Sequence, residues 1–217
     1  MSRPRVARLM RGLGLQGVTR RRTRSSTGAG AGRAAPDLVR RRFEASGPDR
    51  LWVADITCVP TGEGFLYVAT VMDAFSRKVV GWAMGARQTA ELTRSALGMA
   101  VRTRGPEEVV FHSDRGTQYT ALAFSERCAA AGVVQSMGAP GSCYDNAMAE
   151  SLFATLECEL LQRVPLATRA EAEREVFRYV EGFYNRRRRH SALGYLSPAE
   201  FERQWHAGRA APGPSAP

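Results

Sequence analysis

The stretch Leu51-Trp-Val-Ala-Asp-Ile-Thr-Cys-Val59 is followed by two more β-rich runs, Phe65-Leu-Tyr-Val-Ala-Thr-Val-Met72 and Lys78-Val-Val-Gly-Trp-Ala-Met84. Short loops separate the three runs, a pattern typical of an antiparallel meander. Downstream, helical and strand patterns alternate: a helix over about 89–101, a strand over 109–113, a helix over 121–131 and a strand over 133–136. Together they predict an α/β fold, a mixed five-stranded sheet with helices on both faces.

The composition is that of a globular chain. Of its 217 residues, 44% are hydrophobic and 24% are charged, which excludes wholesale disorder, collagen and a disulfide scaffold. No apolar run approaches the roughly 18 residues that span a bilayer, and no signal-peptide segment follows the amino-terminal arginines. The cysteines and histidines show no zinc-ligand spacing. We therefore expect a soluble, unexported, cytoplasmic protein with reduced thiols.

The positive charge is concentrated at the amino end. Residues 1–50 contain 13 arginines and three acids, and the remainder is balanced, so the net charge of +10 belongs to this segment. Apolar residues between 6 and 13 predict a short basic helix within it. Such an arm suits nucleic-acid phosphates, because neutralising them releases counterions. A GC-rich coding sequence could also explain the excess of arginine. We expect Arg20, Arg21 and Arg22 to bind DNA.

Changes of composition divide the chain into four segments. A basic arm and a linker rich in glycine occupy 1–47, and the core that contains the predicted sheet occupies 48–165. A helical extension follows over 166–206, and 207–217 is expected to be a disordered tail.

Helix-capping residues punctuate the second half of the chain. Asp145 or Asn146 can cap a helix that starts behind a glycine-rich loop. Capping boxes that begin at Thr168 and at Ser197 open two further helices, the second of which we expect to end near residue 206.

Three acids stand out by their place in the pattern. Asp55 interrupts an apolar strand that reads as buried on both faces, where a carboxylate needs a compensating cation or strong donors. Asp114 ends the strand over 109–113, and Glu150 lies near the start of a helix. Each acid has an ordinary alternative explanation: an arginine partner for Asp55, a turn cap for Asp114, and a favourable charge near a helix start for Glu150.

Such carboxylates can converge into a site for hard divalent cations. Mg²⁺ takes one or two protein carboxylates and leaves its other positions to water and substrate phosphate. Two such ions, roughly 3.5 to 4 Å apart, can stabilise the attacking and leaving oxygens of a phosphoryl transfer. The sequence therefore makes Asp55, Asp114 and Glu150 candidates for a catalytic, metal-binding triad.

Three motifs around these acids resemble the catalytic core of DDE transposases and retroviral integrases. They are Trp52-Val-Ala-Asp55-Ile-Thr57, His112-Ser-Asp114-Arg-Gly-Thr-Gln-Tyr119 and Asp145-Asn-Ala-Met-Ala-Glu150-Ser-Leu-Phe153. The last two acids are separated by 35 residues, the spacing characteristic of that superfamily. The stretch from Tyr184 to Phe201 is similar to the carboxyl end of bacterial insertion-sequence transposases of the IS-three family, downstream reading frame. The likeness covers about 49–205.

The resemblance implies a ribonuclease-H-like fold and a transposase that cleaves DNA at insertion-sequence ends and joins the freed 3′-hydroxyl to a second phosphodiester. It implies that Asp55, Asp114 and Glu150 bind two Mg²⁺ or Mn²⁺ ions. The implied partners are terminal inverted repeats, target DNA, further copies of the chain and an upstream-frame helix-turn-helix protein. A catalytically inactive DNA-binding remnant is the alternative, and a nuclease that cleaves without joining is a third interpretation.

Further DNA contacts are expected from side chains near the motifs: Arg115, Gln118, Arg186, Arg187, Arg188 and Arg189. The four consecutive arginines could instead be a solvated helix end. Family members frequently carry a basic residue seven positions after the catalytic glutamate, but Glu157 stands there in this chain. Either this face of the helix stays clear of DNA, or another base, Arg163 or the run Arg186–Arg189, takes over.

The remaining expectations concern the amino end, two single residues and one loop. Residues 8–22 resemble the end of a helical segment that precedes the core in longer relatives, so we expect a late start or a truncated copy. Asp73 is expected to be a turn residue, and His112 a packing or orienting residue. The loop over 138–144 is either an element that seats DNA or a plain connector.

Overall fold

The computed structural model describes residues 2–15, 34–138 and 146–210. Its centre is a five-stranded sheet of order β3-β2-β1-β4-β5. The strands are β1 (Leu51–Thr61), β2 (Gly64–Asp73), β3 (Val79–Gly85), β4 (Val109–Ser113) and β5 (Val133–Met137). β1, β2 and β3 form an antiparallel meander, whereas β1, β4 and β5 run parallel. The predicted mixed five-stranded sheet is confirmed.

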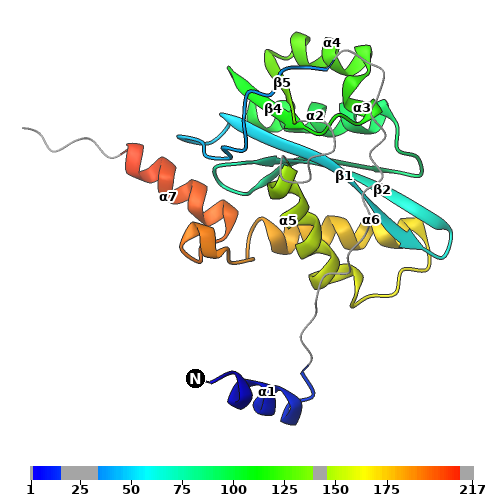
Figure 1. Cartoon of the computed structure of the whole chain (residues 1–217), viewed down its shortest axis with the longest axis vertical. Helices are drawn as coiled ribbons and strands as arrows, with labels where there is room; N and C mark the ends of the chain where they lie inside the picture. Colours follow the sequence, from blue (N-terminus) through cyan, green and yellow to red (C-terminus); the bar gives the residue numbers. More distant parts are fainter. Residues whose placement is uncertain (1, 16–33, 139–145, 211–217) are drawn as a thin grey trace, which may run out of the picture.

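Helices cover both faces of this sheet, as predicted (Figure 1). α2 (Ala90–Arg104), α3 (Thr117–Thr120) and α4 (Leu122–Ala130) cover one face. The opposite face carries α5 (Ala147–Leu156), which continues as η2 (Glu157–Leu161), and α6 (Arg169–Phe177), which continues as η3 (Arg178–Tyr184). A short turn of helix, η4 (Ser191–Leu193), precedes α7 (Pro198–Ala210).

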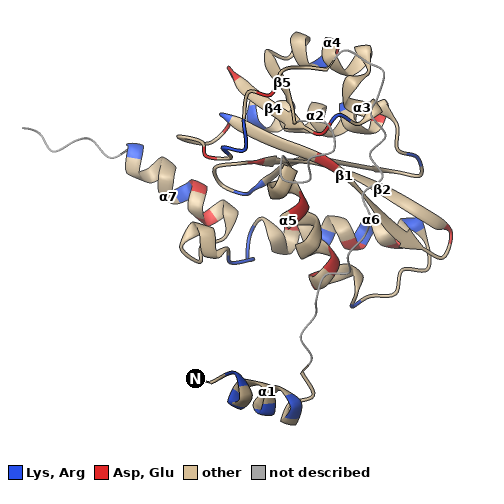
Figure 2. Cartoon of the chain, in the orientation of Figure 1, with Lys and Arg blue, Asp and Glu red and all other residues tan. Residues whose placement is uncertain are grey.

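The basic helix predicted near the amino end is present as α1 (Arg3–Gly12), and none of its residues is buried. Figure 2 shows several basic residues along it and no acidic ones. None of the helices in the described part of the chain combines the length and the apolar character that crossing a membrane requires.

Strand alternation assigns each side chain of β1 to one of two cores. Val53 and Val59 pack into a core shared with α5 and α6, whereas Trp52 and Ala54 pack into the core shared with α2 and α4. Because successive side chains of a strand point to opposite faces, Asp55 belongs to the face covered by α5.

The carboxyl-terminal helices pack against the same sheet. Ala172 and Val176 of α6 are buried in the core that α5 also lines. The capping box at Thr168 is confirmed, since its side chain accepts from Glu171 N at 3.1 Å and the Glu171 carboxylate accepts from Thr168 N at 3.4 Å. α7 runs to Ala210, beyond the expected end at residue 206, so residues 207–210 are helical and not part of a disordered tail. In this added turn Arg209 lies over the ring of Trp205, 4.8 Å from its centroid.

A close approach between β3 and α2 depends on Gly81. A Cβ atom at this position would overlap Ala96 O and lie 2.8 Å from Ala100 N. We therefore expect Gly81→Ala to lower the free energy of unfolding by about 1–3 kcal/mol, as overpacking of a dense core does, in urea denaturation. Gly182→Ala is the matched control, because nothing lies within 4 Å of its added Cβ. Equal stability of the two variants would contradict this prediction.

Candidate active site

The register of two neighbouring parallel strands determines where two of the three acids lie. β1 and β4 pair Val53 with His112. Asp55 and Asp114 each lie two residues further along, and side chains two apart share a face of the sheet. Asp55 Oδ1 accepts from Ile56 N at 2.7 Å, and Asp114 Oδ1 accepts from the N–H of Gly116 at 3.0 Å. Both carboxylates are thus oriented by backbone donors.

The third acid is carried by the helix that crosses this face. Glu150 lies in the first turn of α5. The predicted cap of that helix is wrong for Asn146, because its side chain makes no capping hydrogen bond and instead donates from Nδ2 to Ala54 O at 3.3 Å. Asp145, the other predicted cap, lies outside the described residues. Asn146 therefore fastens the start of α5 to β1, next to Asp55.

The three acids interact electrostatically. Burial raises the pKa of Asp55 to about 8, and the negative charges of Asp114 and Glu150 add to this, against the lowering effect of the Ile56 N–H. Burial also raises the pKa of Asp114, despite its hydrogen bond from Gly116. The buried Tyr119 has a raised pKa, through burial and then through the charges of Asp55 and Asp114. The acidic positions of β1 and α5 lie near the centre of the molecule (Figure 2).

The chemistry of these donors fits a divalent cation, although the side chains are not arranged around one. Among the described residues, no three His, Cys, Asp or Glu side chains are placed to hold a metal ion together. Within the same part of the chain, neither Asp55 nor Asp114 bonds a basic side chain. Desolvated carboxylates without a cation are costly, and Mg²⁺ needs only one or two protein carboxylates. The amide Oδ1 of Asn146 is a further buried oxygen that has no partner among the described residues.

The residues predicted to bind DNA differ in their hydrogen bonds and in their exposure. Arg115 Nε donates to Gly138 O at 2.8 Å, and Gln118 Nε2 lies 3.5 Å from Gln88 O. Arg188 is held by Glu159, whose two carboxylate oxygens lie 2.9 and 3.0 Å from Arg188 Nε. Three of the predicted residues are exposed: Arg186, Arg187 and Arg189. Three others lie outside the described residues: Arg20, Arg21 and Arg22.

Two further expectations are confirmed. Asp73 is a turn residue, since its Oδ1 accepts from both the backbone N and the hydroxyl of Ser76 at 2.8 Å. His112 is a packing residue, 1% exposed, with Nδ1 2.9 Å from Ser136 Oγ and its ring edge-on to Phe43. Most of the loop over 138–144 lies outside the described residues.

Glu157 and Arg163, one of the bases suggested to replace it, both make local contacts. Glu157 accepts a hydrogen bond from Gln162 at 3.1 Å. Arg163, the base suggested in its stead, donates from Nε to Cys158 O at 3.1 Å, an exposed contact within its own helical segment.

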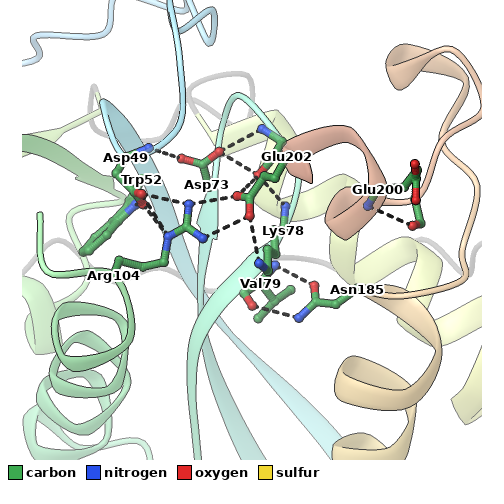
Figure 3. Close-up of polar contacts among 11 residues, drawn as sticks. Asp49, Trp52, Asp73, Lys78, Val79, Arg104, Asn185, Glu200 and Glu202 are labelled. Atoms are coloured by element: carbon green, nitrogen blue, oxygen red, sulfur yellow. Dashed lines mark hydrogen bonds and ion pairs between the residues drawn. The ribbon is translucent and has the colours of Figure 1, made fainter. Parts of the chain in front are cut away.

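One charged cluster has no counterpart in the sequence analysis (Figure 3). Arg104, at the end of α2, donates from Nε to both carboxylate oxygens of Asp49 at 2.8 and 2.9 Å. Its other nitrogens donate to Glu202 of α7 at 2.9 and 3.0 Å, and Lys78 Nζ lies 2.8 Å from the same carboxylate. No local pattern could have revealed this cluster, because Arg104 and Glu202 are 98 positions apart.

Solved structures identify the class of fold. A chain of the simian T-cell lymphotropic virus intasome in complex with PP2A regulatory subunit B56 gamma matches with a TM-score of 0.61 at 16% identity, over 89% of this chain and 64% of that chain. The HTLV-2 integrase catalytic core domain in complex with magnesium matches with a TM-score of 0.53 at 17% identity, over 73% of this chain and 99% of that one. The sheet and helices therefore form the ribonuclease-H-like fold of retroviral integrase cores.

Sequence relatives identify the family. Two integrase core domain models match residues 45–143 and 131–198. The transposase for insertion sequence element IS904 of Lactococcus lactis is 39% identical over 92% of this chain and 79% of its own length. The putative transposase for IS986/IS6110 of Mycobacterium tuberculosis is 41% identical over 98% of this chain and 79% of its own length. The chain belongs to the insertion-sequence transposases with an integrase core domain.

Proposed function

We propose that this chain is a DDE transposase that cleaves DNA strands at insertion-sequence ends and transfers them to target DNA, with Asp55, Asp114 and Glu150 as its metal-binding catalytic residues. The observation that carries the proposal is the meeting of the three acids: burial raises the pKa of Asp55 to about 8, and the negative charges of Asp114 and Glu150 add to this. Like charges are brought together in this way where a cation or a substrate phosphate compensates them. The names of the relatives, which are transposases of insertion sequences, support the same activity.

Asp55, Asp114 and Glu150 would hold Mg²⁺ or Mn²⁺, with two ions per site. Bound divalent cations supply charge stabilisation to the attacking and leaving oxygens of a phosphoryl transfer. The magnesium in the HTLV-2 integrase core structure supports this choice of metal.

The chain's own residues orient the acids. The N–H of Ile56 donates to one oxygen of Asp55, and the N–H of Gly116 donates to one oxygen of Asp114. These hydrogen bonds fix the orientation of each carboxylate. Asn146 fixes the start of α5 against β1 and thereby positions Glu150. Water attacks the first phosphodiester and the freed 3′-hydroxyl attacks the second, so no protein side chain forms a covalent intermediate in this scheme.

The partners and the compartment follow from the same proposal. The substrate is DNA, as terminal inverted repeats and as target. Several copies of the chain assemble on it in the cytoplasm, and an upstream-frame helix-turn-helix protein assists in reading the ends.

Strand cleavage and joining on labelled duplexes that carry the element's terminal repeats test the proposal. We expect product with Mg²⁺ or Mn²⁺ from the wild-type chain, and none above background from Asp114→Asn or Glu150→Gln. Glu126→Gln, an exposed acid on α4, is the matched control and should keep wild-type activity. Wild-type rates in the two site variants would overturn the triad, and DNA binding without any product from the wild-type chain would identify an inactive remnant.

A further inference from the structure

A pocket opens beside α5 and is lined by side chains that flank Glu150 in the sequence of the helix. Its volume is about 480 Å³. One face of α5 lines it with Met148, Ser151 and Thr155, the turn between β2 and β3 contributes Arg77, and the segment after η3 contributes residues 188–192 and 195. The pocket therefore shares a helix with the candidate active site and lies next to it in sequence.

The lining is positively charged. It includes three arginines, Arg77, Arg188 and Arg189, and none of its residues is acidic. Arg188 is already neutralised by Glu159 and lies over the ring of Tyr184, 5.8 Å from its centroid. In the described part of the chain, no hydrogen bond or ion pair involves the guanidinium of Arg77 or Arg189. Two unpaired cations thus face one pocket.

Arg77 is the more constrained of these two cations. Its backbone adopts φ 62°, in the left-handed region, and its N–H donates to Asp73 O at 2.9 Å. Such a conformation persists in a non-glycine residue where the surrounding structure holds it. Burial lowers the pKa of Arg77, so the guanidinium is partly removed from water, and no anionic side chain among the described residues compensates it. An anionic ligand would supply that compensation.

The other polar groups of the pocket suit an oxyanion. Burial, and then the charges of Arg188 and Arg77, lower the pKa of His190 to about 4, so this side chain is neutral near pH 7. Ser151 adds a hydroxyl group on the face of α5. The floor is apolar, with Met72, Met148 and Leu152, and gives room for more than a bare anion.

We propose that this pocket binds a phosphodiester of the DNA strand that passes α5, with the phosphate on Arg77 and Arg189 and the adjoining sugar over the apolar floor. The inference rests on the proposed function, because the DNA is that of the transposition reaction. Guanidinium groups suit phosphate because they present paired donors to its oxygens. Arg188 is a positioning residue here, which stays with Glu159 and holds the segment that carries Arg189.

The salt dependence of DNA binding tests this pocket. Fluorescence anisotropy with a labelled terminal-repeat duplex measures the affinity of the full chain over a range of salt concentrations. The logarithm of the binding constant falls linearly with the logarithm of the salt concentration, and each phosphate contact makes this slope more negative by about one unit. We expect the double variant Arg77→Gln with Arg189→Gln to reduce the magnitude of this negative slope by about one unit, because the two arginines share one phosphate, and each single variant to give part of that reduction. Gln at position 77 leaves the backbone strain there unchanged. Arg189 is exposed, so Arg189→Gln should fold.

The matched control is the double variant Arg178→Gln with Arg203→Gln. Both arginines are exposed and pair with acids of their own helical segment, Glu175 and Glu200, so the control removes the same net charge away from the pocket. An unchanged slope in both pocket variants, or an equal loss in the control, would overturn the pocket. Cleavage by the wild-type chain with unchanged slopes in the variants refutes the pocket alone. Reduced slopes without metal-dependent cleavage by the wild-type chain refute the proposed function and leave the phosphate site in place.

Discussion

Replacing Asp55 with asparagine is expected to make the metal-free protein more stable while abolishing strand cleavage. The Asp55 carboxylate is partly buried, beside Asp114 and Glu150, and burial and then these charges raise its pKa from 3.8 to about 8. Its charged form is therefore unfavourable in the folded protein, and the neutral amide removes that penalty. We expect a gain on the order of 2 kcal/mol at pH 9, which corresponds to about 4–8 °C in melting temperature.

The gain should depend on pH in a defined direction. Between pH 3.8 and about 8, the folded protein retains a proton on Asp55 that the unfolded chain releases. The stability of the wild-type protein therefore falls as the pH rises through this window, whereas the asparagine variant lacks this dependence. The difference in melting temperature should be smallest near pH 4 and largest above pH 8.

Magnesium should reverse the order of stability. A ligand that binds the folded state raises its stability, so Mg²⁺ should raise the melting temperature of the wild-type protein more than that of Asp55→Asn. Glu108→Gln, an exposed acid before β4, is the control and should behave like the wild type with and without metal. A variant that melts below the wild type at pH 9 without metal would contradict the electrostatic description of the site.

Removing the guanidinium of Arg104 is expected to destabilise the protein by about 3–5 kcal/mol, the usual effect of breaking a buried ion pair from one side. Burial alone would raise the pKa of Glu202, but hydrogen bonds from Arg104 and Lys78 hold it below its usual range. Glu202 is 4% exposed, so Arg104→Met leaves a buried carboxylate with reduced compensation. The melting temperature should fall by about 6–20 °C, and hydrogen exchange should increase in α7, which the cluster ties to α2.

Arg102→Met is the matched control, because Arg102 is exposed on the same helix. A double variant, Arg104→Met with Glu202→Leu, should recover part of the loss, since it also removes the buried carboxylate that only Lys78 would still compensate. If Arg104→Met melts with the control, the cluster in Figure 3 contributes little to stability.

Local patterns were enough to predict the elements of this fold. The β-rich runs that begin at Leu51 and the capping box at Thr168 were interpreted correctly, because burial on a sheet and satisfaction of helix-end donors depend on neighbours in the sequence. Asp55 was identifiable for the same reason, as a charge inside an apolar strand. Its role in catalysis remains a prediction that the experiments above test.

The sequence by itself determined the mixed sheet, its helices and the unusual position of Asp55. The tertiary structure alone decided that Asn146 bonds β1 instead of capping α5, and that Arg188 pairs with Glu159 while Arg189 faces a pocket. The physical reason is that a polar side chain takes whichever partner the packed chain brings within hydrogen-bonding distance, and those partners lie tens of residues away in the sequence.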